Sequence, residues 1–204
     1  WLGSIGFRND MQAVVYDRQG VNYCGRLWWM LKWAGHEAVA VLDGGWQAWQ
    51  ASGAPMQSGP PTALTATAFE LQPSLARLID ANGVLSQLGR PEQTILDARA
   101  EARYRGEVEP LDPVAGHIPG ALNRAFALNL GSDGCFKPAE QLRSEFAALL
   151  AGRNPASVVH HCGSGVSAIP NLIAMEVAGL GRATLYGGSW SDWCSDRTRP
   201  MAQG

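Results

Sequence analysis

The feature that most constrains the fold of this chain is a succession of segments that occurs twice. An apolar stretch at residues 13–16 is followed by a turn that begins at Asp17, a predicted helix over 23–33 and a second apolar stretch at 38–42. The same order recurs near the C-terminus, where Cys162 stands in the place of Asp17 after an offset of 145 residues. Short apolar stretches of this kind are typical of buried strands. A strand–turn–helix–strand unit that occurs twice predicts two copies of one βα fold.

The order of the predicted elements indicates an α/β protein with two domains. Strands that alternate with helices favour a mainly parallel sheet flanked by helices in each domain. We predict that residues 1–55 are the C-terminal part of a first domain, 56–67 a linker rich in proline and glycine, and 68–204 a second domain. The chain begins at Trp1 and only 12 residues precede the first strand. We therefore expect the first domain to be truncated, without its N-terminal half.

Local patterns place further elements in the second domain. Ser74 has the chemistry of a helix N-cap, so we predict a helix over 74–83. Residues 94–99 are predicted to be a strand that runs into a polar turn, and 139–151 an amphipathic helix. A further strand is predicted at 183–186, after the second copy of the helix.

Cys162 lies in a loop whose composition favours anion binding. It follows a predicted strand and precedes a predicted helix over 168–179 with Pro170 in its first turn. Gly163 and Gly165 allow the loop to curl so that successive backbone N–H groups point inward, and the helix adds the positive end of its dipole. A thiolate at Cys162 would be stabilised there and would act as a nucleophile. The alternative is a small buried apolar side chain, the commoner role of a single cysteine after a strand.

Composition and charge argue against several other classes. A net charge of −2, with 17% charged residues, gives no electrostatic case for binding nucleic acid or a membrane. No apolar run approaches the roughly 20 residues of a membrane span. The four cysteines are widely spaced, which favours a reducing cytoplasm over a disulfide framework. The adjacent His160 and His161 would point to opposite faces of a strand, so we predict no metal site.

The stretch from Cys162 to Ala168, Cys-Gly-Ser-Gly-Val-Ser-Ala, resembles the active-site loop of the tandem-domain rhodanese sulfurtransferases. It is most similar to the 3-mercaptopyruvate branch, whose loop reads Cys-Gly-Ser-Gly-Val-Thr-Ala; the thiosulfate branch has Arg-Lys after the cysteine. The resemblance extends over nearly all of the chain and implies two rhodanese-like domains, of which the first, with Asp17, is not catalytic. Three further segments resemble signatures of the family: Asp97–Arg99, Gly116–Ala121 and Gly188–Trp193.

The resemblance implies a sulfurtransferase that moves a sulfane sulfur from a small donor, with 3-mercaptopyruvate favoured, through a persulfide on Cys162. The acceptor would be cyanide, a thiol or a thioredoxin-like protein, and no cofactor is needed. One alternative is a thiosulfate:cyanide sulfurtransferase, and another is a non-enzymatic persulfide carrier or interaction module. A cysteine phosphatase would need arginine at the end of a Cys-x5-Arg loop, where this chain has Ala168.

The resemblance also assigns roles to individual residues. Cys162 is the nucleophile, and the Ser164 hydroxyl would assist the leaving group. Arg103 would bind the carboxylate or sulfonate of the donor, because a guanidinium pairs with such groups in a bidentate way; Arg105 is a weaker alternative. The remaining substrate-binding residues would supply the backbone cradle: Gly163, Gly165, Val166 and Ser167.

Four nearby positions bear on specificity and structure. The 3-mercaptopyruvate branch has a second arginine in a Glu-Pro-Arg context, where this chain has Leu111. The sequence therefore leaves the donor undecided between 3-mercaptopyruvate and thiosulfate. His117 belongs to a structural turn in the family, although a histidine could also act as a base. Asp97 and Arg99 are expected to form an ion pair that supports the active-site loop.

Overall fold

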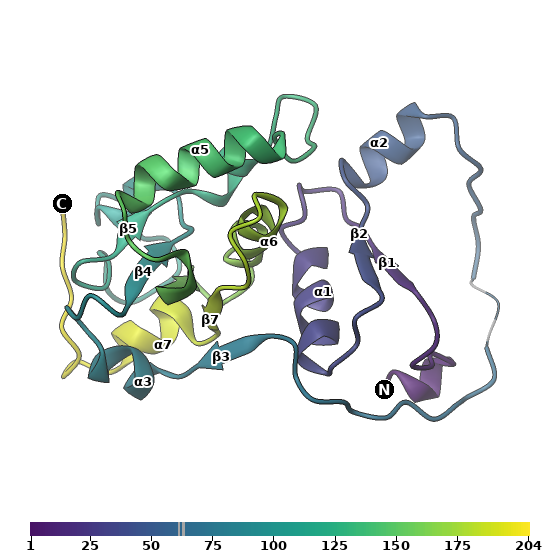
Figure 1. Cartoon of the computed structure of the whole chain (residues 1–204), viewed down its shortest axis with the longest axis horizontal. Coiled ribbons are helices and arrows are strands. Elements are labelled where there is room, and N and C mark those ends of the chain that lie inside the picture. The colour runs from purple at the N-terminus through teal and green to yellow at the C-terminus, as the bar shows by residue number, and fades with distance from the viewer. Residues whose placement is uncertain (61, 63) are drawn as a thin grey trace. The chain divides into compact units, whose positions relative to one another are not determined.

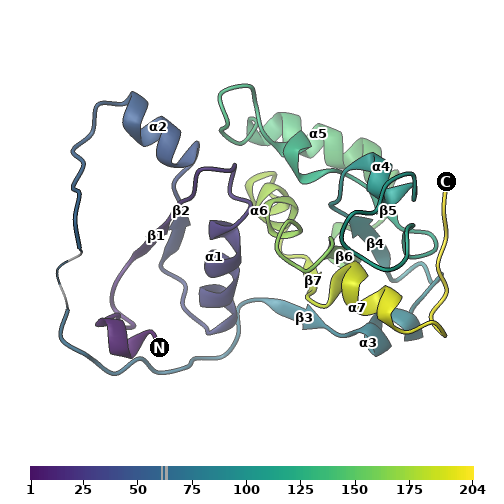
Figure 2. The same cartoon turned by 180° about the vertical axis from the view of Figure 1, so that it is seen from behind.

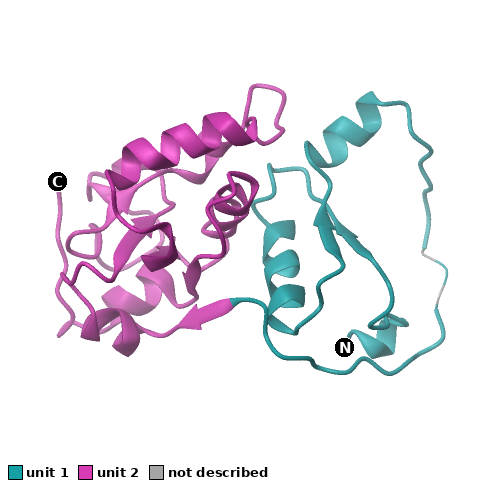
Figure 3. Ribbon diagram, in the orientation of Figure 1, with its two compact units in different colours: residues 1–76 teal, residues 77–204 magenta. Residues whose placement is uncertain are grey.

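The structure is a computed structural model that describes residues 1–60, 62 and 64–204 (Figure 1). It divides into two compact units, Trp1–Ala76 and Arg77–Gly204 (Figure 3). The domain limits at residues 55 and 67 stay a prediction, and Pro61 and Ala63 of the predicted linker lie outside the described residues.

The first unit contains the first copy of the repeated succession. Its two strands are parallel, with Ala13 opposite Val39 and Val15 opposite Val41. Trp29 and Leu31 are buried on the helix between them, so the apolar stretches predicted from the sequence form a small core. The elements are η1 (Gly3–Ile5), β1 (Ala13–Val15), α1 (Cys24–Trp33), β2 (Val39–Val41) and α2 (Gly45–Ala51).

The second unit is built on a five-stranded sheet. Its strand order is β3-β7-β6-β4-β5, and every pair is parallel, as the alternation of strands and helices predicted. The strands are β3 (Arg77–Ile79), β4 (Thr94–Asp97), β5 (Leu122–Asn123), β6 (Val158–His161) and β7 (Thr184–Tyr186). The helices are α3 (Ala81–Ser86), α4 (Glu101–Tyr104), η2 (Phe126–Asn129), α5 (Ala139–Leu150), η3 (Pro155–Ser157), α6 (Ile169–Val177) and α7 (Ser189–Ser195).

Helices cover both faces of this sheet. Figures 1 and 2 show α5 and α6 on one face and α3 and α7 on the other. The α7 face holds an apolar core that includes Val159, Trp190 and Trp193. Because side chains alternate along a strand, the buried residues of β6 contribute to both layers. The sheet is thus covered on both sides, and its ends are the places where a site can open.

The helix predicted over residues 74–83 is wrong. Residues 77–79 form β3, which pairs in parallel with β7 from Arg77 opposite Thr184 to Ile79 opposite Tyr186. The helix begins only at Ala81, and its N-cap is Asp80, whose side chain accepts the N–H of Gly83 at 2.8 Å. Pairing with a distant strand therefore overrides the local helix pattern.

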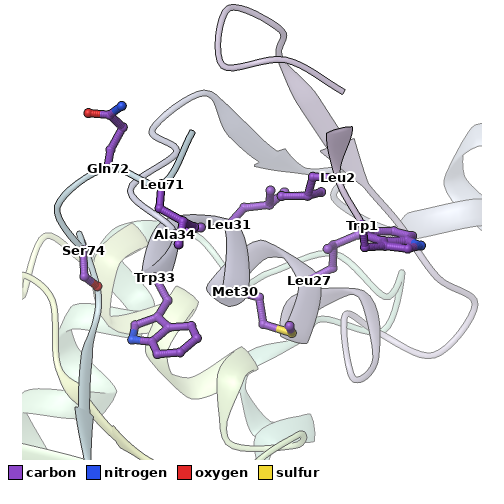
Figure 4. A pocket seen from close by; sticks show the side chains of 10 residues that line it. All are labelled: Trp1, Leu2, Leu27, Met30, Leu31, Trp33, Ala34, Leu71, Gln72 and Ser74. Carbon is purple, nitrogen blue, oxygen red and sulfur yellow. The ribbon is translucent and has the colours of Figure 1, made fainter. Parts of the chain in front are cut away.

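The first unit also carries an apolar cavity of about 410 Å³ (Figure 4). Leu27, Met30 and Trp33 line it from α1, and Leu71 lines it from the segment that follows. The lining offers almost no polar groups, so the cavity contributes no chemistry of its own. Over the described part of the chain, no helix is long and apolar enough to cross a membrane.

Candidate active site

Cys162 lies at the carboxyl end of β6, between that strand and α6. Open parallel sheets bind ligands at this end of their strands. The side chain is 2% exposed, and α6 carries Pro170 in its first turn as predicted. Cys162 forms no disulfide with another cysteine of the described residues. The predicted order of strand, cysteine loop and helix is confirmed, and it places the sulfur next to the start of α6.

The backbone on both sides of Cys162 is tied to the start of α7. The N–H of Cys162 donates to Ser189 Oγ at 3.1 Å, and the Ser189 hydroxyl donates to the carbonyl of Tyr186 at 2.9 Å. The N–H of Trp190 donates to the Cys162 carbonyl at 3.0 Å, and that of Ser191 to the Gly163 carbonyl at 2.9 Å. These bonds fix the first residues of the loop against the neighbouring strand end.

Gly165 is required by the shape of the loop. Its φ angle is 75°, a left-handed conformation that residues with a Cβ rarely adopt. A Cβ at this position would also overlap with the carbonyl oxygen of Gly187. The loop therefore turns sharply and passes close to the segment that leads into α7.

The curled loop leaves backbone donors available around the cysteine. The N–H groups of Gly163, Ser164, Val166 and Ser167 have no hydrogen-bond acceptor within the part of the chain that the structure describes. Helix α6 begins two residues later and directs its positive end towards the same loop. Unpaired N–H groups in a tight turn are the usual means by which a backbone binds an anion.

Arg103, the predicted donor-binding residue, is brought next to this loop. A Cβ built on Gly163 would lie 3.5 Å from Arg103 Nη1 and 3.7 Å from Nη2. The guanidinium also bonds to two carboxylates, Glu109 and Asp112. Arg105 instead forms an ion pair with the exposed Glu101 of the same helical turn.

The buried ion pair between Asp97 and Arg99 is connected to Arg103 through Glu109. Arg99 donates to both oxygens of Asp97, with Nη2–Oδ2 at 2.7 Å, and so forms the ion pair expected from the sequence. Its Nη1 also donates to Glu109 at 3.3 Å, and its guanidinium lies over the ring of Trp190. Glu109 thus bridges Arg99 and Arg103. Through Arg99, this bridge connects the loop after α4 to Asp97, the last residue of β4.

The structure also places three other residues that the sequence singles out, Ser164, Leu111 and His117. Ser164 is exposed in the loop that follows Cys162. Leu111 is 78% exposed, and its side chain has no charge with which to bind an anionic donor. His117 stacks on Tyr104 with ring centroids 3.9 Å apart, and its Nδ1 lies 2.8 Å from the Tyr104 carbonyl oxygen, a structural arrangement.

The two histidines before Cys162 face opposite sides of the sheet. His160 Nε2 lies 3.1 Å from Met175 Sδ, whereas His161 Nδ1 lies 3.2 Å from the Cys162 carbonyl oxygen. Burial lowers the pKa of His160 to about 3 and also lowers the pKa of His161, so both are neutral. Within the described residues, no group of three or more histidine, cysteine or acidic side chains is arranged to hold a metal ion.

Sequence reasoning missed three residues of this site. Nothing in the local sequence pattern of Glu109 and Asp112 indicates that they hold Arg103. Ser189 was noted only as part of a Gly-Ser-Trp segment, and its bond to the N–H of Cys162 follows from the three-dimensional position of that turn. The one signal available was the proximity in sequence of Arg103 to the Glu109-Pro110 pair.

Comparison with known proteins gives the same family for both copies of the repeat. A family model described as "Rhodanese-like domain" matches residues 2–52 and 80–196. A Pseudomonas aeruginosa protein named "Probable 3-mercaptopyruvate sulfurtransferase" is 50% identical over 204 residues, all of this chain and 72% of that protein. The thiosulfate sulfurtransferase of Bos taurus is 35% identical over 202 residues, 95% of this chain and 66% of that protein.

Solved structures show the same fold. The crystal structure of YnjE matches 100% of this chain with a TM-score of 0.87 and 24% sequence identity. The chain spans 51% of that structure's length. At this level of identity the match concerns the arrangement of strands and helices alone.

Proposed function

The chain belongs to the rhodanese-like domain family, and we propose that it is a sulfurtransferase that carries the transferred sulfur as a persulfide on Cys162. The relatives named as 3-mercaptopyruvate and thiosulfate sulfurtransferases support this class of reaction. We propose 3-mercaptopyruvate as the preferred donor, because the relative with 50% identity carries that name and the Cys162 loop has glycine and serine after the cysteine.

The reaction proceeds in two half-reactions. The Cys162 thiolate attacks the donor sulfur, an S–S bond forms, and the C–S bond of 3-mercaptopyruvate breaks with its electron pair on carbon. The resulting pyruvate enolate takes up a proton and leaves as pyruvate. Cyanide or a thiolate then attacks the outer sulfur of the persulfide and restores the Cys162 thiolate. A covalent enzyme intermediate of this kind gives ping-pong kinetics.

The observation that carries the proposal is the ring of unpaired N–H groups around Cys162 with a guanidinium at its edge. The N–H groups of Gly163, Ser164, Val166 and Ser167 can stabilise the thiolate and the persulfide. Arg103 Nη1 lies on the Gly163 side of the ring, where the carboxylate of the donor would bind.

Ser164 would donate its hydroxyl to the oxygen of the leaving group. It is exposed at the loop, so its hydroxyl can turn towards a bound donor. Proton donation matters more for a developing enolate than for sulfite, which is a stable anion. Ser164 is therefore expected to matter more with 3-mercaptopyruvate than with thiosulfate.

The acceptor and the compartment complete the proposal. We expect a small thiol or a thioredoxin-like protein as the acceptor in the cell, with cyanide as an assay substrate. We expect a reducing cytoplasm, because the four cysteines are few and widely spaced in the sequence. The two half-reactions as proposed use no metal or organic cofactor, because Cys162 itself carries the sulfur between donor and acceptor.

A second candidate is a thiosulfate:cyanide sulfurtransferase, favoured by the bovine relative's name and by the absence of an arginine at Leu111. A third is a persulfide carrier without turnover. The three are separated by one assay, sulfur transfer to cyanide with each donor in turn, for the unaltered chain and for Cys162→Ser.

Turnover with 3-mercaptopyruvate that is lost in Cys162→Ser is the expected result. A higher kcat/KM with thiosulfate would move the assignment to the second candidate. A persulfide on Cys162 without turnover would favour the carrier, and no persulfide from either donor would overturn the sulfurtransferase proposal. Cys135→Ser is the matched control, because it removes a thiol outside the Cys162 loop.

A further inference from the structure

The guanidinium of Arg103 is held by two carboxylates. Glu109 accepts Arg103 Nη2 at 2.6 Å and Nε at 3.3 Å, and Asp112 Oδ2 lies 3.2 Å from the same Nη2. The side chains of Glu109 and Asp112 are 3% and 8% exposed, against 20% for Arg103. Because two nitrogens of the fork bond to one buried carboxylate, the plane of the guanidinium is fixed.

The third nitrogen of Arg103 is the one left for a ligand. Nη1 donates no hydrogen bond to any residue that the structure describes. It is also the nitrogen nearest to the place that a Cβ of Gly163 would occupy, at 3.5 Å. The carboxylates therefore take up Nε and Nη2 and leave Nη1 at the edge of the Cys162 loop.

Glu109 is itself fixed as an anion. It accepts the N–H groups of Leu111 and Asp112 at 3.1 and 3.2 Å, and Arg99 Nη1 at 3.3 Å. Burial acts to raise the pKa of Glu109, but the hydrogen bond from Arg103 and those from the two N–H groups outweigh it, and the pKa lies below its usual value. The carboxylate stays charged at neutral pH and keeps its hold on Arg103.

The cluster as a whole carries an excess of negative charge. Arg99 and Arg103 contribute two positive charges, whereas Asp97, Glu109 and Asp112 contribute three negative ones. A donor bound at Nη1 therefore meets the guanidinium of Arg103, but the cluster as a whole, Arg103 included, has a net charge of −1. At an effective dielectric constant of about 20, one further unit charge within about 10 Å changes an equilibrium constant by about tenfold.

We infer that Glu109 and Asp112 select donors with a single negative charge, such as 3-mercaptopyruvate, over dianions such as thiosulfate. Glu109 positions Arg103, and Asp112 supplies the excess charge. This inference rests on the proposed function, in which Arg103 binds the anionic group of the donor. It gives a physical basis for donor preference that does not need a second arginine at Leu111.

The first test is Asp112→Asn, which removes one charge and keeps an oxygen that can accept from Arg103. Persulfide formation on Cys162 is followed by mass spectrometry in single-turnover reactions with 3-mercaptopyruvate and with thiosulfate. We expect the ratio of kcat/KM for thiosulfate to that for 3-mercaptopyruvate to rise by about three- to tenfold. The matched control is Glu107→Gln, which removes the same charge from an exposed side chain five residues earlier.

The second test is Glu109→Gln, which loosens Arg103. We expect KM to rise about tenfold or more with both donors, because the fixed orientation of Nη1 is lost. Discharge of a preformed Cys162 persulfide by cyanide should change by less than twofold, since that step does not use Arg103. A loss confined to the donor step distinguishes positioning from general damage to the loop.

Two outcomes would overturn the inference. One is a donor ratio that Asp112→Asn leaves unchanged while the unaltered chain forms the persulfide; the other is an equal change of the ratio in Glu107→Gln. If the unaltered chain forms no persulfide with either donor, the proposed function fails, and this inference fails with it.

Discussion

The loops that follow β1 and β6 share a backbone design but differ in what fills them. In the first unit, the carboxylate of Asp17 accepts the N–H groups two, four, six and seven residues further along, at 2.8 to 3.1 Å. In the second unit, Cys162 stands at this position. The N–H groups two, four and six residues further along, of Ser164, Val166 and Ala168, find no acceptor among the residues that the structure describes.

The two loops are also anchored in the same way. The N–H of Trp46 donates to the Asp17 carbonyl at 2.9 Å, and the N–H of Trp190 donates to the Cys162 carbonyl at 3.0 Å. A glycine three residues after each position has a left-handed φ, 64° at Gly20 and 75° at Gly165. The residue at this one position therefore makes the difference between the loops. In the first loop the Asp17 carboxylate accepts the backbone N–H groups, whereas in the second loop the N–H groups after Cys162 stay available to an anion from outside the chain.

Replacing Cys162 with aspartate should convert the second loop into the first. We expect Cys162→Asp to form no persulfide and to lose sulfur transfer by at least about 10³-fold, because a carboxylate cannot attack the donor sulfur. The carboxylate should accept the open N–H groups, so this variant should exceed Cys162→Ser in free energy of unfolding by up to about 2 kcal/mol.

The measurement is a urea titration of both variants beside the cyanide assay. Cys162→Ser is equally inactive but has no second oxygen with which to bridge the loop. An aspartate variant less stable than the serine variant would show that the two loops do not share one anion site.

The next largest effect is expected at Gly165, in the turn that follows Cys162. Gly165→Ala should lower the free energy of unfolding by about 2 kcal/mol or more, because the new Cβ would overlap with the Gly187 carbonyl as well as strain a left-handed φ. Activity should fall as the N–H groups around Cys162 shift. Urea unfolding and the cyanide assay together test this.

Gly152→Ala is the matched control for that prediction. Gly152 also has a left-handed φ, but its Cβ would meet nothing within 4 Å. We expect a cost of about 1 kcal/mol and unchanged activity. Equal costs at both sites would mean that the close approach to Gly187 does not matter.

The filled loop should depend on its own carboxylate. Asp17→Ala removes the acceptor of four N–H groups, and solvent reaches part of the loop, so we expect a loss of about 1–3 kcal/mol. Asp17→Asn keeps one oxygen and should lose less. Urea unfolding monitored by the tryptophans gives both values, and an alanine variant as stable as the original would contradict the role of Asp17.

Much of this comparison can be predicted from the sequence. The repeat, the parallel strands and the position of Cys162 between a strand and a helix follow from local pattern, because each element has the length and spacing of its type. The offset between the two copies alone identifies Asp17 as the counterpart of Cys162. That its carboxylate fills the loop could not be read, since this depends on how the turn curls.

The failures lie where distant segments decide the structure. Residues 77–79 form a strand because they pair with β7, which lies more than a hundred positions later in the chain. The local sequence does not predict such pairing between distant segments. Glu109 fixes Arg103 because the loop after α4 folds back on it. Both features depend on contacts between segments that the sequence does not place side by side.

The smallest predicted effect is a pH dependence of the stability that Asp17 contributes to the first loop. The N–H groups that bond to Asp17 oppose the effect of its burial and hold the pKa of this carboxyl below its usual value. A carboxyl with a lowered pKa in the folded state stabilises the protein above the pKa of the unfolded chain, and this contribution is lost as the pH falls through the lower, folded value.

The stability difference between the unaltered chain and Asp17→Asn should therefore shrink as the pH is lowered from neutral to about 3. Other carboxylates titrate over the same range, but they are common to both chains and cancel in the difference. Urea titrations at successive pH values measure it, and a difference that stays constant would mean that Asp17 is not the anion that closes the first loop.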